Sequence, residues 1–324
     1  MFFAMRFDFR NPAFAATSTA DRYAAALDMA AWADRLGCLS ITLSEHHGSE
    51  DGYLPSPIPM LAAMAARTTN VRFMIAALIA PLHDPVRLAE DLVVADNLSN
   101  GRIDIVVAGG YVRREFEMFD VPMKERVRRV VDAVRILKAA FAGDPFEHRG
   151  RTVRITPTPC RPGGPSVVLG GSGEGAARRA ARIADGFLPS EPKFWEFYRD
   201  ELITLGKPDP GPCPIPENSV VALAKDAEKG WEKMAPFFLH ENNAYGAWQA
   251  ENSAPSPYRT VADVDALRTT GRYRVLTPEQ LIEEQKAVAF PFALLHPLCG
   301  GIPPALAWES LRLFEHHVLP AFQH

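Results

Sequence analysis

Glu45, His46 and His47 form a segment rich in titratable groups, directly after a short apolar run at residues 39–43. Imidazole changes its charge near physiological pH, so a histidine in this position suits acid–base catalysis or hydrogen bonding to a polar cofactor. The competing interpretation is that one of the two histidines only anchors the loop. A metal site is disfavoured, because adjacent residues rarely both reach one ion and no third ligand follows nearby.

A second candidate is the glycine-rich segment of Gly170, Gly171, Ser172 and Gly173, between a strand-like run and a helix-like run. Glycines let the backbone approach a ligand closely, and free N–H groups at a helix N-terminus attract phosphate. The segment predicts a phosphate-binding loop. The alternative is a tight strand–helix connection without a ligand.

Gly109, Gly110 and Tyr111 end another apolar run. Consecutive glycines allow a flat ring to come close, and Tyr111 can stack on such a ring or donate a hydrogen bond to it. A simple turn at a strand end explains the same residues equally well. Ala76 and Ala77, inside the run at residues 71–79, read on their own as small core residues.

Other charged and aromatic residues are expected to be structural. Arg113, Arg114 and Glu115 form a short charged run that predicts a solvated surface. Some aromatic residues could line an apolar pocket, although ordinary packing is the better expectation for each: Phe14, Tyr53, Phe116, Trp248 and Tyr258.

These segments sit in a regular alternation of short apolar runs and longer amphipathic stretches. The strand-like runs are at residues 2–9, 39–43, 71–79, 103–107, 166–169, 186–188, 219–223 and 292–295. Helical spacing is found at residues 19–36, 57–67, 85–98, 124–141, 174–184, 194–205, 278–289 and 304–314. Alternation of this kind predicts an α/β fold with parallel strands, and eight units favour a closed (β/α)₈ TIM barrel over an open doubly wound sheet.

One part of the chain does not follow this alternation. Residues 206–218 form a proline-rich connector, and residues 225–276 show no clean period. A barrel with one insertion of this size accounts for the length, so we expect a single domain over residues 1–324. The variable segment at 206–276 is a candidate lid over the active site.

The composition limits the classes of binding partner and the cellular compartment that we expect for this protein. With 35 basic and 39 acidic residues the net charge is -4, which gives no electrostatic reason to expect nucleic acid or an anionic membrane. The four cysteines are widely separated and form neither a disulfide framework nor a zinc-ligand pattern. No apolar run is long enough to span a bilayer and no secretion signal is recognisable, so we expect a soluble cytoplasmic protein.

Taken together, the segments resemble the bacterial luciferase-like flavin monooxygenases. The resemblance rests on Glu45-His46-His47, on residues 76–102, on residues 165–173 and on the closing stretch at residues 311–322. It covers nearly the whole chain apart from residues 206–276. It implies a luciferase-like TIM barrel that binds FMN, or in some branches the deazaflavin coenzyme F420, at the carboxyl ends of the strands.

The resemblance also implies roles for individual residues. His46 matches the catalytic histidine of the family, which handles protons near the reactive edge of the flavin. Ala76 and Ala77 match the position of a non-prolyl cis peptide that supports the flavin ring. Ser172 matches a phosphate-binding serine, with the backbone N–H groups of Gly171 and Gly173 beside it.

Two positions depart from the family pattern. Gly109 stands where the luciferases have a phosphate-binding arginine, which predicts weaker FMN phosphate binding unless another cation replaces it. Deazaflavin-using relatives often have small residues here, so the cofactor type stays open. Ala108 occupies the position of the reactive cysteine of luciferase, so no thiol chemistry is expected.

Three functions follow from the resemblance. The first is a flavin-dependent monooxygenase that uses O2 and reduced FMN, supplied by a separate flavin reductase, to oxidise a small organic substrate. The second is an F420-dependent oxidoreductase that transfers hydride without oxygen. The third is a non-catalytic flavin-binding relative. Luciferase-like proteins are commonly dimeric, which adds a homodimer as an expectation from resemblance alone.

Overall fold

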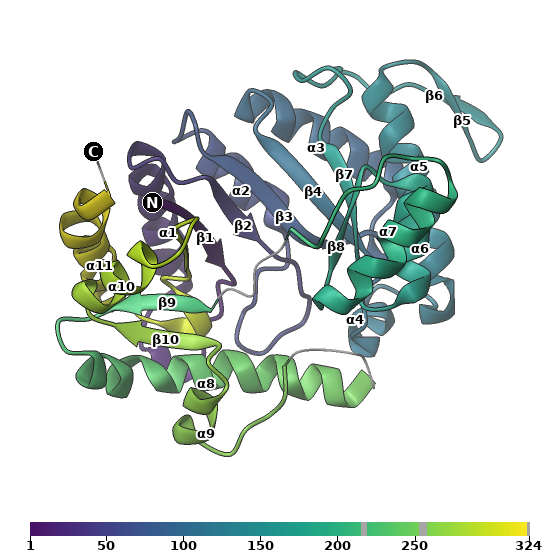
Figure 1. Ribbon diagram of the computed structural model, residues 1–324. Coiled ribbons are helices and arrows are strands. Elements are labelled where there is room, and N and C mark those ends of the chain that lie inside the picture. Colours follow the sequence, from purple (N-terminus) through teal and green to yellow (C-terminus); the bar gives the residue numbers. More distant parts are fainter. Residues whose placement is uncertain (215–218, 253–257, 323–324) are drawn as a thin grey trace.

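The structure is a computed structural model that describes residues 1–214, 219–252 and 258–322. Parallel strands alternate with helices around one main sheet (Figure 1). That sheet has nine strands in the order β10-β9-β11-β1-β2-β3-β4-β7-β8. Their bounds are β1 Phe2–Phe7, β2 Ser40–Leu43, β3 Arg72–Ile79, β4 Ile103–Ala108, β7 Ser166–Gly171, β8 Gly186–Pro189, β9 Val220–Leu223, β10 Tyr273–Leu276 and β11 Phe292–Leu295.

The helices pack against this sheet and against one another. They are α1 Thr19–Arg35, α2 Pro57–Ala65, α3 Pro85–Ser99, α4 Arg113–Met118, α5 Arg126–Ala142, α6 Glu174–Ile183, α7 Trp195–Thr204, α8 Ala227–Asn252, α9 Val264–Thr269, α10 Pro278–Lys286 and α11 Pro304–Leu313. A separate antiparallel hairpin is formed by β5 Phe146–His148 and β6 Arg151–Val153.

Local sequence explains where several helices begin. The Ser18 side chain accepts the N–H of Asp21 before α1, and Asp84 accepts the N–H groups of Val86 and Arg87 at the start of α3. Thr277 and Gln280 form a capping box at α10. Such caps satisfy N–H groups that the helix itself leaves without partners, so they fix the points where the chain leaves a strand and enters a helix.

The predicted TIM-barrel-like α/β fold is confirmed. All eight predicted strands are present, and each neighbouring pair in the main sheet is parallel. The sequence prediction missed the two short hairpin strands β5 and β6 and, in the main sheet, the strand β10, whose four residues follow a long stretch without a clear period. It pairs with β9 at the end of the sheet order.

The predicted variable segment contains regular structure. It holds the 26-residue helix α8, the short helix α9 and the strand β10, whereas residues 215–218 of the connector and 253–257 lie outside the described residues. Figure 1 shows α8 running along β9 and β10. Its end approaches the start of α4, where the Arg113 N–H donates to Asn252 Oδ1 at 3.0 Å.

Parallel strands bring their carboxyl ends to one edge, and the candidate segments lie there. Residues 44–47 follow β2, residues 109–111 follow β4 and residues 172–173 follow β7. Between β3 and β4 the register shifts at Ala76/Leu78, which marks a bulge in β3. None of the helices in the described ranges is both long and apolar enough to cross a membrane.

Candidate active site

A cavity of about 840 Å³ opens at the carboxyl ends of the strands. Its walls come from β1, from the ends of β2, β3, β4, β7 and β8, and from α5, α6 and α8. Every residue predicted from the sequence for the site lines this one cavity: His46, Ala76, Ala77, Gly109, Gly110, Tyr111, Gly170, Gly171, Ser172 and Gly173.

His46 is held by a buried carboxylate from α4. Its Nδ1 lies 2.8 Å from Oε1 of Glu115, and the same oxygen accepts the backbone N–H of His47 at 2.9 Å. The prediction that Glu115 is solvated was wrong, since this residue is only 1% exposed. With Nδ1 donating to the carboxylate, a neutral imidazole has an unprotonated Nε2. This nitrogen forms no hydrogen bond with any described residue and is available to a ligand.

Aromatic rings surround His46. The centroid of the Trp248 ring lies 4.4 Å from that of His46, and those of Tyr53, Tyr111 and Tyr245 lie 4.9, 5.8 and 6.0 Å away. Tyr53 lines the cavity, whereas ordinary packing had been the better expectation for it. His46 is only 7% exposed among these rings, and burial strengthens the electrostatic interaction of the imidazole with Glu115.

Glu45 ties the histidine segment to its surroundings. Its Oε1 accepts hydrogen bonds from Nε2 of His47 at 2.9 Å and Nε2 of His83 at 2.7 Å, and its Oε2 accepts the Ile79 N–H at 2.6 Å. Burial opposes ionisation, but the hydrogen bonds from His47 and His83 lower the pKa of Glu45 to about 2. Burial likewise opposes charge on His83, while the hydrogen bond with Glu45 raises its pKa. His47 and Glu45 are therefore anchoring residues of the loop.

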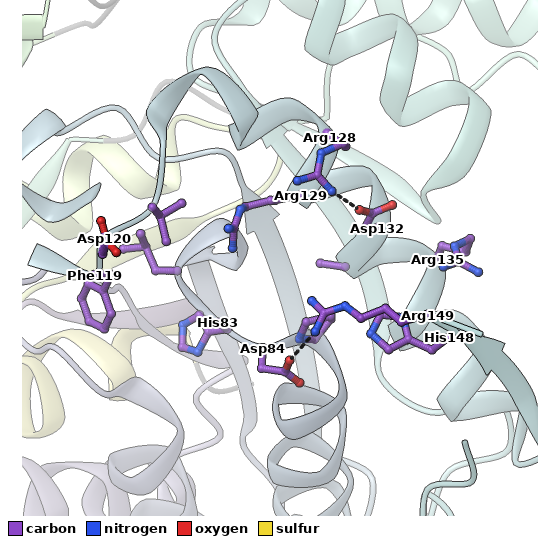
Figure 2. Close-up of a pocket in the computed structure, with 14 residues that line it drawn as sticks. His83, Asp84, Phe119, Asp120, Arg128, Arg129, Asp132, Arg135, His148 and Arg149 are labelled. Atoms are coloured by element: carbon purple, nitrogen blue, oxygen red, sulfur yellow. Dashed lines mark hydrogen bonds and ion pairs between the residues drawn. The ribbon is translucent and has the colours of Figure 1, made fainter. Parts of the chain in front are cut away.

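His83 also faces a second cavity, of about 460 Å³ (Figure 2). Its arginine-rich wall is largely neutralised, because Arg128 pairs with Asp132 at 3.1 Å and Arg149 with Asp84 at 3.7 Å. None of the residues predicted for the site lines this cavity.

The bulge of β3 forms the floor between the histidine and the glycine-rich loop. The peptide between Ala76 and Ala77 is cis, as the family resemblance implies. The Ser44 hydroxyl donates to the carbonyl oxygen of Ala76 at 2.6 Å, so the residue before Glu45 fixes this bulge from the neighbouring strand.

The glycine-rich loop forms the opposite end of the cavity. Gly173 precedes α6 and supplies no side-chain cap, and the Ala176 N–H donates to the Gly173 carbonyl oxygen, so the N–H groups of Glu174 and Gly175 at the helix start are the ones available to an anion. At Gly171 a Cβ atom would lie 2.3 Å from Cβ of Ala176, so only glycine fits between this strand end and α6. At Gly173 nothing lies within 4 Å of an added Cβ.

Two arginines of this cavity were missed in the sequence. Arg126 begins α5, and its Cγ and Cδ would each lie 3.9 Å from a Cβ built on Gly109. Arg179 on α6 also lines the cavity, and partial burial lowers its pKa. A cation therefore lies next to the position where the family has its arginine. No short sequence motif predicts this position for Arg126, because the residue reaches the cavity only through the packing of α5 on β4.

The remaining wall of the cavity is made of polar and aromatic side chains, most of which were not predicted from the sequence to line the site. Arg6 on β1 donates to the hydroxyl of Tyr245 at 2.9 Å and of Tyr258 at 3.5 Å. Gln249 and Arg272 also line this wall. We call it the β1–α8 wall, defined by Arg6, Tyr53, Tyr245, Gln249, Tyr258 and Arg272.

Behind this wall lies a buried set of donors, Asp8, Glu241, His296 and Cys299, whose potential ligand atoms are all within 4.8 Å of one another. The carboxylates of Asp8 and Glu241 each already have a guanidinium group as an ion-pair partner. Arg6 lies 3.1 Å from Glu241, and Arg10 lies 3.7 Å from Asp8. These pairs favour a buried ion-pair network as the role of the set.

Comparison with known proteins agrees with this geometry. Residues 1–289 match the family description "Luciferase-like monooxygenase". The chain is 32% identical over 135 residues to the oxygenase component of a flavin-dependent trigonelline monooxygenase from Acinetobacter baylyi, which covers 40% of this chain and 36% of that protein. It is 28% identical over 188 residues to an F420-dependent glucose-6-phosphate dehydrogenase from Nocardia farcinica, covering 55% and 56% of the two chains.

A solved structure extends the likeness to the full length. The monooxygenase RslO1 from Streptomyces bottropensis superposes with a TM-score of 0.75 at 25% identity, with 100% of both chains covered. Matches to the curated relatives are shorter, and the first two span 38% and 41% of those proteins. The family includes both flavin-dependent monooxygenases and F420-dependent oxidoreductases. By its sequence match over residues 1–289, the chain belongs to the luciferase-like monooxygenase family.

Proposed function

We propose that the chain is the oxygenase component of a two-component flavin monooxygenase, which uses O2 and reduced FMN from a separate reductase to oxidise a small organic substrate. One observation carries the proposal. The His46–Glu115 pair and an anion-binding loop flanked by arginines line the same cavity, with the Ala76–Ala77 bulge between them. This is the layout that a flavin with a phosphate tail requires.

The residues present fit FMN. The phosphate would be held by the Ser172 hydroxyl, by N–H groups at the start of α6 and by the guanidinium groups of Arg126 and Arg179. Charge-assisted contacts of this kind are the strong ones in phosphate recognition. Arg126 compensates for the arginine missing at position 109. The bulge at Ala76 and Ala77 would support the ring.

In the proposed reaction the reduced flavin supplies two electrons, so that one atom of O2 enters the substrate and the other leaves as water. The chain provides placement and proton transfer. His46 Nε2 is positioned to accept or return a proton at the ring end, while Glu115 holds Nδ1 and stabilises the imidazolium when it forms.

An F420-dependent hydride transfer is the second candidate, and Gly109 is the observation that favours it. A Cβ at this position would meet no atom closer than 3.8 Å, so the glycine leaves room for a larger head group. Both cofactors carry a phosphate, so the loop and the arginines serve either one.

A direct test titrates the purified chain, without oxygen, with photoreduced FMN and separately with reduced F420, followed by tryptophan fluorescence. We expect reduced FMN to bind, and the bound form to react with admitted O2 at a rate different from that of free reduced FMN. Tighter binding of F420 with no oxygen uptake would overturn the monooxygenase in favour of the second candidate. Binding of neither cofactor would overturn both candidates, and binding of reduced FMN without any effect on its reaction with O2 would favour the non-catalytic alternative.

The segment at residues 206–276 stays a prediction as a lid. Tyr245, Gln249 and Asn252 of α8 line the cavity, which supports an enclosing role for this part of the chain. The homodimer also stays an expectation from the family.

A further inference from the structure

We propose that the cavity accepts a phenol, whose hydroxyl group donates a hydrogen bond to Nε2 of His46 and accepts one from the hydroxyl of Tyr111. This inference rests on the proposed function, because it assigns the space beside His46 to the substrate and the glycine-rich end to the flavin. It goes further by naming the reacting group of the substrate and by giving Tyr111 a catalytic role.

Tyr111 brings a hydroxyl without a hydrogen-bond partner into the cavity. The residue follows β4, and its ring stands edge-on to the ring of His46 with the two centroids 5.8 Å apart. The hydroxyl forms no hydrogen bond with any described residue and is not among the polar atoms that are buried without a partner, so a ligand can reach it. Burial raises the pKa of Tyr111, so the hydroxyl keeps its proton and acts as a donor.

The tyrosine hydroxyls of the β1–α8 wall are already hydrogen-bonded. Those of Tyr53 and Tyr245 lie 2.7 Å apart. Arg6 donates to the hydroxyl of Tyr245 at 2.9 Å and to that of Tyr258 at 3.5 Å. Within the described part of the chain, Tyr111 is thus the tyrosine of this cavity whose hydroxyl remains for a ligand.

His46 supplies the matching acceptor. With Nδ1 held by Glu115, the neutral imidazole carries a lone pair and no proton at Nε2. A carbonyl group offers only lone pairs and would satisfy Tyr111 alone, whereas a hydroxyl group donates and accepts through the same oxygen. The neighbouring side chains of His46 and Tyr111 therefore fit a hydroxyl group.

Aromatic rings surround the space in which this hydroxyl group would lie. Tyr53, Tyr111 and Tyr245 all line the cavity, and their ring centroids lie 4.9, 5.8 and 6.0 Å from that of His46. A flat ring gains from edge-to-face and offset-stacked contacts with such neighbours. An aliphatic alcohol would form the same hydrogen bonds without these contacts, so the rings favour a phenol.

The charges near this space favour a substrate that enters without net charge. Arg6 is paired with Glu241 at 3.1 Å, and the buried Arg10 is paired with Asp51 and Asp8. Both guanidinium groups are therefore neutralised within the protein, and burial of a further unpaired charge is costly. A neutral phenol avoids that cost.

Proton transfer inside this arrangement leaves the total charge of the site unchanged. The O–H bond of the phenol breaks with both electrons staying on oxygen, and an N–H bond forms at Nε2 of His46. The Tyr111 hydroxyl donates to the resulting phenolate oxygen, and Glu115 stabilises the imidazolium. The ring of a phenolate is richer in electrons than that of a phenol, which favours entry of an oxygen atom at a ring carbon.

The test measures binding of 4-nitrophenol, its methyl ether 4-nitroanisole and decanal to the full chain by calorimetry, with and without FMN. The ether keeps the ring and an accepting oxygen but has no O–H to donate. We expect the phenol to bind at least about 10-fold more tightly than the ether. At a pH where free 4-nitrophenol is mostly un-ionised, the absorption spectrum of the bound ligand should be that of the phenolate, which reports transfer of the proton to His46.

Two variants separate the donor from the acceptor. Tyr111→Phe keeps the ring and removes the donor, so it should weaken binding of the phenol about 10-fold and return the spectrum of the bound ligand toward the un-ionised form. His46→Ala should abolish the phenolate spectrum. Tyr198→Phe removes a hydroxyl from a buried ring outside the cavity, so it is the matched control and should behave as the wild type.

Equal binding of phenol and ether, tighter binding of decanal, or an unchanged phenolate spectrum in Tyr111→Phe overturns the inference. A parallel loss of FMN affinity in Tyr111→Phe also overturns it, because the hydroxyl would then belong to the cofactor. FMN affinity is measured in the same samples. If FMN binds and the phenol shows no preference, the substrate class fails and the flavin function stands; if FMN binds to no sample, the proposed function fails separately.

Discussion

His46 Nδ1 lies 2.8 Å from Glu115 Oε1, and that oxygen also holds the backbone of His47 at 2.9 Å. One carboxylate from α4 thus sets both the orientation and the tautomer of the imidazole that faces the cavity. Glu115, on the short helix α4, therefore positions His46, the residue expected to transfer protons at the carboxyl ends of the strands.

Replacing this carboxylate should slow the reaction without removing the cofactor. We expect Glu115→Gln to lower the rate at which O2 oxidises bound reduced FMN about 10-fold, because a neutral amide stabilises an imidazolium poorly. The acidic limb of the pH–rate profile should move to lower pH, a change that a purely structural role would not produce. Stopped-flow spectroscopy measures both effects.

Glu117→Gln is the matched control, because Glu117 is exposed on the same helix. If Glu117→Gln and Glu115→Gln give the same pH–rate profile as the wild type, the positioning role of Glu115 is wrong.

The two adjacent histidines should respond differently to substitution. His46→Ala should lower turnover far more than it lowers the melting temperature, because Nε2 of His46 faces the cavity. His47→Ala should instead destabilise the fold by about 1–3 kcal/mol, since it leaves the buried Glu45 with one partner fewer. Calorimetry and oxygen uptake on the same samples separate the effects, and equal losses of activity in two folded variants would contradict the assignment of His46.

Arg126 should contribute to binding the phosphate group specifically. Arg126→Gln is expected to weaken FMN binding about 10-fold through loss of a charge-assisted contact, while riboflavin, which lacks the phosphate, should bind as before. Arg135→Gln serves as the control, because Arg135 is exposed on the same helix and does not line the flavin cavity. A parallel loss of riboflavin affinity would mean that Arg126 shapes the cavity and does not bind phosphate.

The Glu45–His83 pair should make stability depend on pH in a defined way. The pKa of Glu45 falls from 4.5 to about 2 on folding, so its contribution is present above pH 4.5 and is lost as the pH falls toward 2. The pKa of His83 is raised from 6.5, so its contribution is complete below pH 6.5 and is lost as the pH rises through the higher folded value. The pair therefore stabilises most between pH 4.5 and 6.5.

Urea unfolding of wild type and His83→Gln at pH 5.5, 7.5 and 9 measures this dependence. The difference in unfolding free energy should be largest at pH 5.5 and should shrink toward pH 9. A difference that grows with pH would show that the sign is wrong.

Much of the fold and the site could be predicted because their signals are local. The strand–helix alternation lies in neighbouring residues, and His46 and Ser172 stand where strands end. Glu115 was misread because the surrounding charged residues look solvated, and only the packing of α4 over the histidine loop buries it. Arg126 and Arg6 reach the cavity through contacts between distant segments, which no short pattern records.

In the glycine-rich loop, Gly171 is needed for packing against α6, whereas Gly173 is expected to matter only for ligand binding. Gly171→Ala would place a Cβ 2.3 Å from Cβ of Ala176, so α6 must shift, and we expect a loss of about 1–3 kcal/mol of unfolding free energy. Gly173 has an extended φ of 175° and open space around an added Cβ, so Gly173→Ala should change stability by less than about 0.5 kcal/mol. If the loop binds phosphate, the methyl group in Gly173→Ala should nevertheless lower FMN affinity by crowding the anion. Denaturant unfolding and FMN titration of the two variants check both statements, and unchanged FMN affinity in a fully stable Gly173→Ala protein would refute phosphate binding at this loop.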